Sequence, residues 1–306
     1  MQTADASPTS PRSPQGWLVY GAIVAVGAGL WAANTFIPAQ MPVVAPYEFS
    51  WPIFLAVTLS GYWFARGLKR LPTGVRSGTW RQAAFWGGLL LIWVVTQTSF
   101  EYLAQRMFFT NRLQHVAMHH VGPLLLALNS GGSALLAGAP DWLRNLCRRR
   151  LVLALYNAVQ QPVVAVILFV GLFWFWLIPP VHFVAMLDPV LYQVMNWSMV
   201  VDGILFWALV LDTRPSPPAR VIFGFRAAMA LGVMFPQIVL GALITFANID
   251  LFPYYAYCGR FFQSISAITD QRIGGLVIWI PPAMMSVVAL LFVLRNMRRA
   301  DDPGDR

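Results

Sequence analysis

The sequence predicts an all-α fold: a polytopic helical membrane bundle of seven to eight transmembrane helices, with both termini cytoplasmic. Of its 306 residues, 58% are hydrophobic and only 11% are charged, whereas soluble domains carry about 25% charged residues. Eight apolar stretches are each close to the length that crosses about 30 Å of hydrocarbon. Because hydrocarbon offers no water to open strands, we expect these stretches to be helices.

The apolar stretches follow one another between two polar tails. Residues 1–16 are rich in Ser, Thr and Pro and predict a disordered tail. We expect residues 17–295 to form the membrane domain and residues 296–306 to form a basic and acidic cytoplasmic tail. The first span is the least defined, because the Pro-rich loop 38–52 that follows it could contain a re-entrant segment. We therefore predict seven to eight spans. The predicted spans are 17–37, 51–68, 82–100, 113–136, 162–179, 189–211, 227–248 and 274–294.

Basic residues are distributed unevenly between the two sides of this topology. Sixteen of the 21 Lys and Arg residues fall in the tails or in the loops after the second, fourth and sixth spans. The alternate loops hold four, namely Arg106, Arg112, Arg260 and Arg272. By the positive-inside rule, the richer side is cytoplasmic. The net charge of +9 therefore reflects topology, and we expect lipid rather than nucleic acid as a partner.

Three of the four histidines lie close together in the predicted fourth span. His115 and His119 share a helical face at positions i and i+4, Met118 lies one step round, and His120 follows. Ionisable side chains within a membrane are costly, so each indicates a functional site. The alternative is that these histidines form hydrogen bonds between helices and only stabilise the bundle.

The topology places further ligand-type side chains in the same outer half. His182 falls in the predicted outer loop 180–188, and Cys258 falls in the outer loop 249–273. Imidazole, thiolate and thioether groups suit copper, whereas haem would need ligands from two facing helices. Cys147 lies among cytoplasmic arginines and is interpreted as an unreactive thiol. The predicted copper ligands are His115, Met118, His119, His120, His182 and Cys258.

Other polar residues allow a functional and a structural interpretation each. Asp202 in the sixth span is either a proton relay or a partner of Arg226 or of a backbone group. Glu101 begins an outer loop, where hydration is expected. The segment Asp270-Gln271-Arg272 precedes Gly274-Gly275, which permits close backbone approach. We expect this segment to be a helix cap or the wall of a site.

Several motifs together resemble the CtaG-type cytochrome c oxidase assembly factors. Gln114-His115 followed by Pro123-Leu124-Leu125 is similar to the first signature of that family. Phe252-Pro253-Tyr254-Tyr255 and the block Asp270 to Trp279 are similar to the late signature. The Gly203 to Trp207 end of the sixth span also fits. The resemblance covers roughly residues 50–295, so Gln114, Asp270, Gln271 and Arg272 become candidate functional residues.

The resemblance implies a seven-helix core, a bacterial inner (plasma) membrane location, and a role in maturing haem-copper oxidases, with copper supply inferred. Three family positions differ here. Asn111 replaces a frequent His, Trp176-Leu177-Ile178-Pro179 replaces Trp-His-x-Pro, and Asn196-Trp197 stands near a frequent Glu-His pair. His119, His120, His182 and Cys258 are candidate replacements for the missing ligands.

The resulting hypothesis is a non-enzymatic assembly factor that assists copper delivery at the outer face. Its expected partners are cytochrome c oxidase subunits or other assembly factors. The alternatives are a copper or proton-coupled transporter and a haem-containing membrane oxidoreductase. A visible absorption spectrum would reveal haem, and copper uptake into vesicles would reveal transport.

Overall fold

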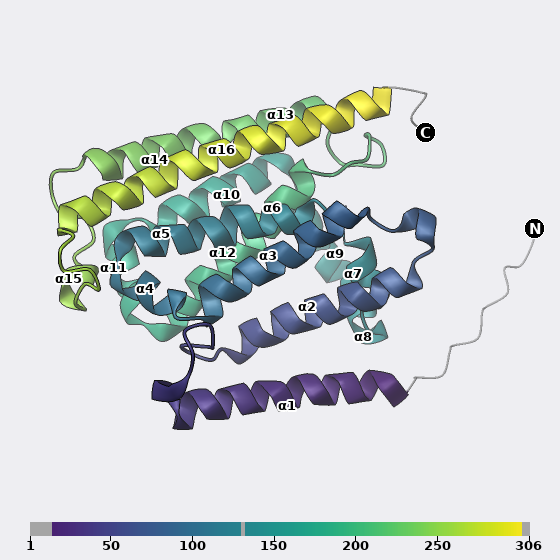
Figure 1. Ribbon diagram of the computed structural model, residues 1–306. Helices are drawn as coiled ribbons and strands as arrows, with labels where there is room; N and C mark the ends of the chain where they lie inside the picture. The colour runs from purple at the N-terminus through teal and green to yellow at the C-terminus, as the bar shows by residue number, and fades with distance from the viewer. Residues whose placement is uncertain (1–13, 130–131, 302–306) are drawn as a thin grey trace, which may run out of the picture.

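The computed structural model describes residues 14–129 and 132–301, and within these ranges all regular structure is helical. The longer helices lie side by side along one direction (Figure 1). They are α1 (Pro14–Phe36), α2 (Trp51–Arg70), α3 (Thr79–Gln97), α10 (Pro162–Trp176), α12 (Pro189–Val210), α13 (Phe223–Gly232), α14 (Met234–Phe246) and α16 (Ala267–Asp301). The all-helical prediction is confirmed for the described residues.

A composite helix runs through the middle of the bundle. It consists of α5 (Phe108–Val116), a π-helical turn η3 (Ala117–Val121) and α6 (Gly122–Ala127). Its successive parts contact α16, α3 and α12. The histidine-rich stretch is therefore enclosed by other helices.

Short helices connect the longer ones at both ends of the bundle. At one end lie α4, α11 and α15, and at the other lie α7, α8 and α9 (Figure 1). The helix α7 packs against α2. Their bounds are α4 (Phe100–Arg106), α7 (Ser133–Gly138), α8 (Asp141–Cys147), α9 (Arg150–Val159), α11 (Pro179–Leu187) and α15 (Tyr254–Tyr257), with 3₁₀ turns η1 (Pro38–Gln40) and η2 (Thr73–Val75).

Four to six segments of the described chain qualify as membrane spans by length and composition. The four are Gly16–Phe36, Pro189–Val210, Phe223–Phe246 and Ala267–Asp301. Two bent pairs, α3 with α4 at 56° and α9 with α10 at 73°, bring the number to six. The helix α2 and the composite α5–η3–α6 lie alongside these but carry more polar residues. The predicted total of seven to eight spans therefore stays a prediction.

The first and last helices have their terminal ends on the same side of the bundle. The start of α1 and the end of α16 lie at the same end of the bundle (Figure 1). An even number of crossings would produce this arrangement, although the cytoplasmic orientation remains a prediction. Residues 1–13 of the predicted tail, and residues 302–306, lie outside the described residues, while residues 296–301 continue α16.

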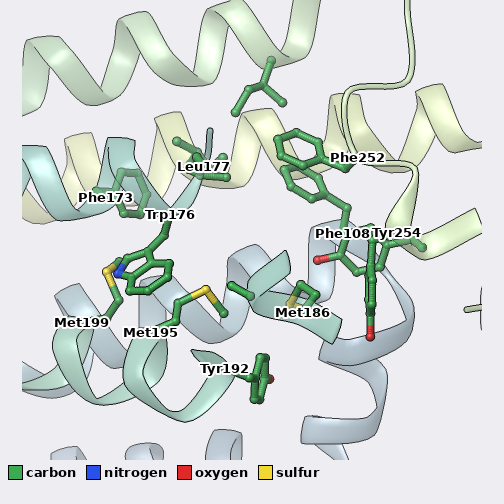
Figure 2. Close-up of a cluster of buried hydrophobic side chains, with 14 of the residues drawn as sticks. Phe108, Phe173, Trp176, Leu177, Met186, Tyr192, Met195, Met199, Phe252 and Tyr254 are labelled. Atoms are coloured by element: carbon green, nitrogen blue, oxygen red, sulfur yellow. The ribbon is translucent and has the colours of Figure 1, made fainter. Parts of the chain in front are cut away.

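Two apolar clusters fill the bundle, one toward each end of the helices. The first includes Phe108, Trp176 and Met195, and the second includes Phe206 and Trp207. Figure 2 shows the first cluster, with Met195 beside the Trp176 ring and Phe108 against Phe252. The His119 ring stacks on Phe173 of the first cluster and on Phe169 of the second. The histidines therefore lie where the two clusters meet.

Candidate functional site

The π-helical turn that carries the histidines has a local cause in the sequence. Pro123 has no backbone N–H, so it cannot donate to the carbonyl of His119 four residues earlier. The turn widens instead, and Gly122 N–H donates to the carbonyl of Ala117. Gly203 of α12 packs directly here, because a Cβ on it would lie 2.4 Å from the His119 carbonyl oxygen. Single π turns within α-helices occur frequently at functional sites.

A carboxylate from a neighbouring helix orients His119. Its Nε2 and Asp202 Oδ2 are joined by a hydrogen bond of 3.0 Å, and its ring stacks on Phe169 with centroids 4.1 Å apart. When Asp202 is ionised, Nε2 must donate, which leaves the lone pair on Nδ1. That Nδ1 is buried without a hydrogen-bond partner. An ionised Asp202 therefore holds His119 in the tautomer with the hydrogen on Nε2.

Arg226, one of the two predicted partners of Asp202, lies elsewhere. Its guanidinium donates to the carbonyl oxygens of Asp212 and Arg214 in the loop after α12. The predicted pairing of Asp202 with Arg226 is therefore wrong. Spacing alone did not reveal the His119 partner, because the two residues lie 83 positions apart.

His115 and His120 are also fully buried but differ in their partners. Both ring nitrogens of His115 are buried with no hydrogen-bond partner. The Gln237 amide donates to His120 Nε2 at 3.0 Å, so Nδ1 of the neutral ring carries the hydrogen. The His119 and His120 ring centroids are 4.8 Å apart. His115 and His119 therefore each have a ring nitrogen whose lone pair is unoccupied, whereas the lone pair of His120 accepts a hydrogen bond from Gln237.

His182 is a buried helical residue, whereas the sequence predicted a loop. It lies in α11, where Nε2 is hydrogen-bonded to the Tyr255 hydroxyl at 3.0 Å and Nδ1 to the Trp176 carbonyl at 3.2 Å. The start of α11 at Pro179 explains the difference, because proline favours the first helical turn. Both ring nitrogens of His182 already have partners.

Met118 and Cys258 have neighbours other than the histidines. Met118 packs with Val95 and Ala117, and Cys258 lies in a loop beside Tyr254. Within residues 14–129 and 132–301, no three His, Cys, Asp or Glu side chains converge to hold a metal ion. The structure keeps His115, His119 and His120 buried along the composite helix, but neither these three nor His182 and Cys258 belong to a metal-binding group of three such side chains in the described residues.

A buried polar network beside His115 was missed. Glu101 was expected to be hydrated, yet it is only 4% exposed, because α4 folds back against α5. Gln114 donates to Glu101 and, at 2.7 Å, to the Val95 carbonyl. The Tyr192 hydroxyl donates to Gln114 Oε1 at 3.2 Å. The Gln-His motif was the only sequence signal for this network.

Arg112 is another buried charge that the sequence placed in an outer loop. It is 0% exposed, and its guanidinium carbon lies 5.1 Å from the Phe108 ring centroid. It donates to the side chain of Asn111, while Nε and Nη1 have no partner. The misplacement arose because α5 begins at Phe108 rather than at residue 113.

The Asp270 carboxylate sets the start of α5. It accepts the backbone N–H groups of Phe108 at 3.0 Å and Phe109 at 2.8 Å, and it pairs with Arg260. Helix N-termini leave such N–H groups unpaired and favour negative charge. Of the two interpretations of the segment 270–272, the cap is the one that the structure forms.

The neighbouring residues of this segment have different surroundings. Gln271 binds the end of α14 and the loop after it through the backbone of Ile244, Ile249 and Leu251. Arg272 is exposed and lies 3.4 Å from Asn248 Oδ1. A Cβ on Gly274 would lie 2.3 Å from the Phe108 ring, so the predicted close approach is confirmed.

The apolar helices and the enclosed polar cluster define a helical membrane protein. The family model of the cytochrome c oxidase caa3 assembly factor (Caa3_CtaG) matches residues 62–300. The chain belongs to this family, and the resemblance seen in the sequence is confirmed. The match begins within α2, so α1 lies outside it. No curated protein and no solved structure matches the chain.

Proposed function

We propose that this protein assists cytochrome c oxidase assembly by receiving Cu(I) as cargo and passing it to an oxidase subunit, without catalysing a reaction. Membership of the assembly-factor family supports the first part. The observation that carries the copper step is the set of buried imidazole nitrogens without partners on His115 and His119. A buried polar atom without a partner is costly, so its retention indicates a ligand.

The donor chemistry at these positions fits copper. Imidazole suits copper, and Cu(I) accepts two or three imidazole or soft ligands. Asp202 holds His119 as outer carboxylates hold metal-binding histidines in known metal sites. We therefore propose His115 and His119 as the ligand pair, with His120 and Met118 adjacent on the same turn. His182 lies in α11 and is hydrogen-bonded to Trp176 and Tyr255, which supports a structural role for that residue.

The proposed location is the outer half of a bacterial inner membrane. The asymmetry of basic residues supports this orientation. Two residues counted as loop cations, Arg112 and Arg226, are buried in helices. Because one comes from each side, the asymmetry persists. Oxidase subunits or other assembly factors are the proposed partners.

The experiment compares membranes with and without this protein. We expect loss of oxidase activity and of oxidase-bound copper while the oxidase subunits are still synthesised, with partial recovery when copper is added to the medium. Unchanged copper uptake by vesicles would separate this role from transport. Normal oxidase activity and normal oxidase copper in the absence of the protein would contradict the proposal.

A further inference from the structure

A cavity of about 610 Å³ lies at the end of the bundle that holds both chain termini. It is lined by residues of α2, α3, α6, α7, α9, α12 and α13 and of the loop after α12. One wall is apolar and includes Phe85, Leu89, Leu126, Leu205 and Leu209. Polar lining residues come from the end of α9, from α13 and from the loop after α12, and they include Tyr156, Gln160, Asp212, Arg214, Arg220 and Arg226. The lining is therefore amphipathic, and its three arginines come from the loop after α12 and the start of α13.

Positive charge exceeds negative charge in this lining. Asp212 pairs with Arg214 at 2.8 Å. Burial acts to raise the pKa of Asp212, but hydrogen bonds from Arg214 outweigh it and hold that pKa below its usual range. Asp212 is therefore ionised at neutral pH and compensates one of the three arginines. Two positive charges remain among the lining residues.

The two other arginines are fixed in place. Arg226 is 0% exposed, donates to two backbone carbonyls, and keeps a buried Nε without a partner. Arg220 donates to Asn157 and lies over the Tyr156 ring, 5.4 Å from its centroid. A guanidinium fixed in this way binds phosphate oxygens with little loss of side-chain entropy.

The apolar side of the cavity continues along α12. A second cavity, of about 220 Å³, shares Ser60, Leu89, Leu126 and Ile204 with the first. It extends toward Asn196 between apolar side chains of α2, α3 and α12. The two cavities therefore adjoin, and together they are called the crevice: arginines line its larger part, and its smaller part is lined mainly by apolar side chains.

We propose that this crevice binds an anionic phospholipid, with the phosphate beside Arg214, Arg220 and Arg226 and one acyl chain along α12. Basic pockets between membrane helices bind anionic lipid headgroups, and the apolar continuation matches a hydrocarbon chain. A free phosphate would use the arginines but would leave the apolar crevice without an occupant. No histidine lines the crevice, although Met118 borders its smaller part, and the lipid assignment does not depend on copper.

The test measures lipid binding to the full-length protein in detergent, by native mass spectrometry and thermal unfolding. Short-chain phosphatidylglycerol should bind and raise the unfolding temperature, whereas short-chain phosphatidylcholine and inorganic phosphate should not. The double variant Arg214→Gln, Arg220→Gln should weaken phosphatidylglycerol binding by about tenfold or more. Arg148→Gln, at an exposed arginine outside the cavity, is the matched control and should bind as the parent does.

A second variant tests the apolar part with all arginines present. Ala208→Phe places a ring in the cavity and should also abolish phosphatidylglycerol binding while the protein stays folded. Equal binding of both lipids, or parental binding by the arginine double variant, would overturn the proposal. Stabilisation by inorganic phosphate alone would show an anion site and would equally overturn the lipid assignment.

Discussion

Buried carboxylates explain much of the polar interior at the scale of single residues. Asp270 caps α5 from a helix that follows it by 162 positions in sequence. Asp202 orients His119, and Glu101 binds Gln114. Asp270 and Asp202 each join two helices that lie far apart in the sequence, whereas Glu101 joins the consecutive helices α4 and α5. The cost of burying each group is offset by the hydrogen bonds that it forms.

Replacing Asp270 should destabilise the protein. Asp270→Ala leaves the N–H groups of Phe108 and Phe109 without partners and Arg260 without its carboxylate, so we expect a loss of about 1–3 kcal/mol. Thermal unfolding of the purified protein measures it. The comparison variant is Asp188→Ala, because Asp188 caps α12 at an exposed position where water can replace it. An equal loss of stability in the two variants would contradict the view that burial makes the Asp270 cap the more important one.

Replacing Asp202 should separate orientation from folding. Asp202→Asn keeps a side chain that can accept from His119 but removes the charge, so we expect near-normal protein abundance. If His119 binds copper, loss of an orienting carboxylate should weaken Cu(I) affinity by about 10–100-fold. Competition with a Cu(I) chelator measures this affinity. An unchanged affinity would assign Asp202 a purely structural role.

At the scale of secondary-structure elements, the close packing of α12 against the π turn depends on Gly203. Gly203→Ala would force α12 away from the His119 carbonyl, and overpacking of this kind costs about 1–3 kcal/mol. We expect lower abundance and a lower unfolding temperature. Gly171→Ala in α10 is the matched control, because a Cβ there meets no atom within 4 Å. A Gly203→Ala protein as stable as the Gly171→Ala protein would show that the close approach can relax.

The sequence predicted several elements closely and others poorly, for physical reasons. The span 189–211 is α12 at Pro189–Val210, because a capping Asp188 and Pro189 mark its start. The start of α5 was missed because its cap, Asp270, comes from a distant helix. Glu101 and His182 were placed in loops because hydropathy does not reveal short helices that fold back onto the bundle.

The site was predictable in part. The clustering of His115, His119 and His120 was visible in the sequence, and the structure keeps them buried on consecutive parts of the composite helix, His115 in α5 and the other two in η3. Their partners Asp202 and Gln237 come from other helices, so periodicity gave no indication of either pairing. His182 and Cys258 were grouped with them from predicted loop positions, but His182 lies in α11 with both ring nitrogens hydrogen-bonded, and Cys258 lies beside Tyr254.

At the scale of the whole molecule, the two ends of the bundle differ in chemistry. By prediction, they also lie on opposite sides of the membrane. The helix α8 lies at the end with the termini, and α15 lies at the opposite end (Figure 1). Trp142 in α8 is 64% exposed, and Tyr257 in α15 is 76% exposed. Single cysteines at these positions therefore report the orientation of the protein.

We expect a membrane-impermeant thiol reagent applied to spheroplasts to label Tyr257→Cys and to spare Trp142→Cys. Both variants carry Cys147→Ser and Cys258→Ser, so that each reports one site. Detergent permeabilisation should then allow labelling of both. The opposite pattern in sealed cells would reverse the orientation and place the histidines in the inner half.

The most direct test of the central claim measures protein abundance, bound copper and oxidase activity in the same membranes for His115→Ala, His119→Ala and the double variant. We expect near-normal abundance, with copper and oxidase activity falling together. Each single change should cost as much as the pair, because a site that lacks one ligand is already compromised. His182→Ala is the control, expected to lower abundance through its lost partners. Normal abundance with unchanged copper and unchanged activity in the double variant would contradict the account and leave these histidines a structural role.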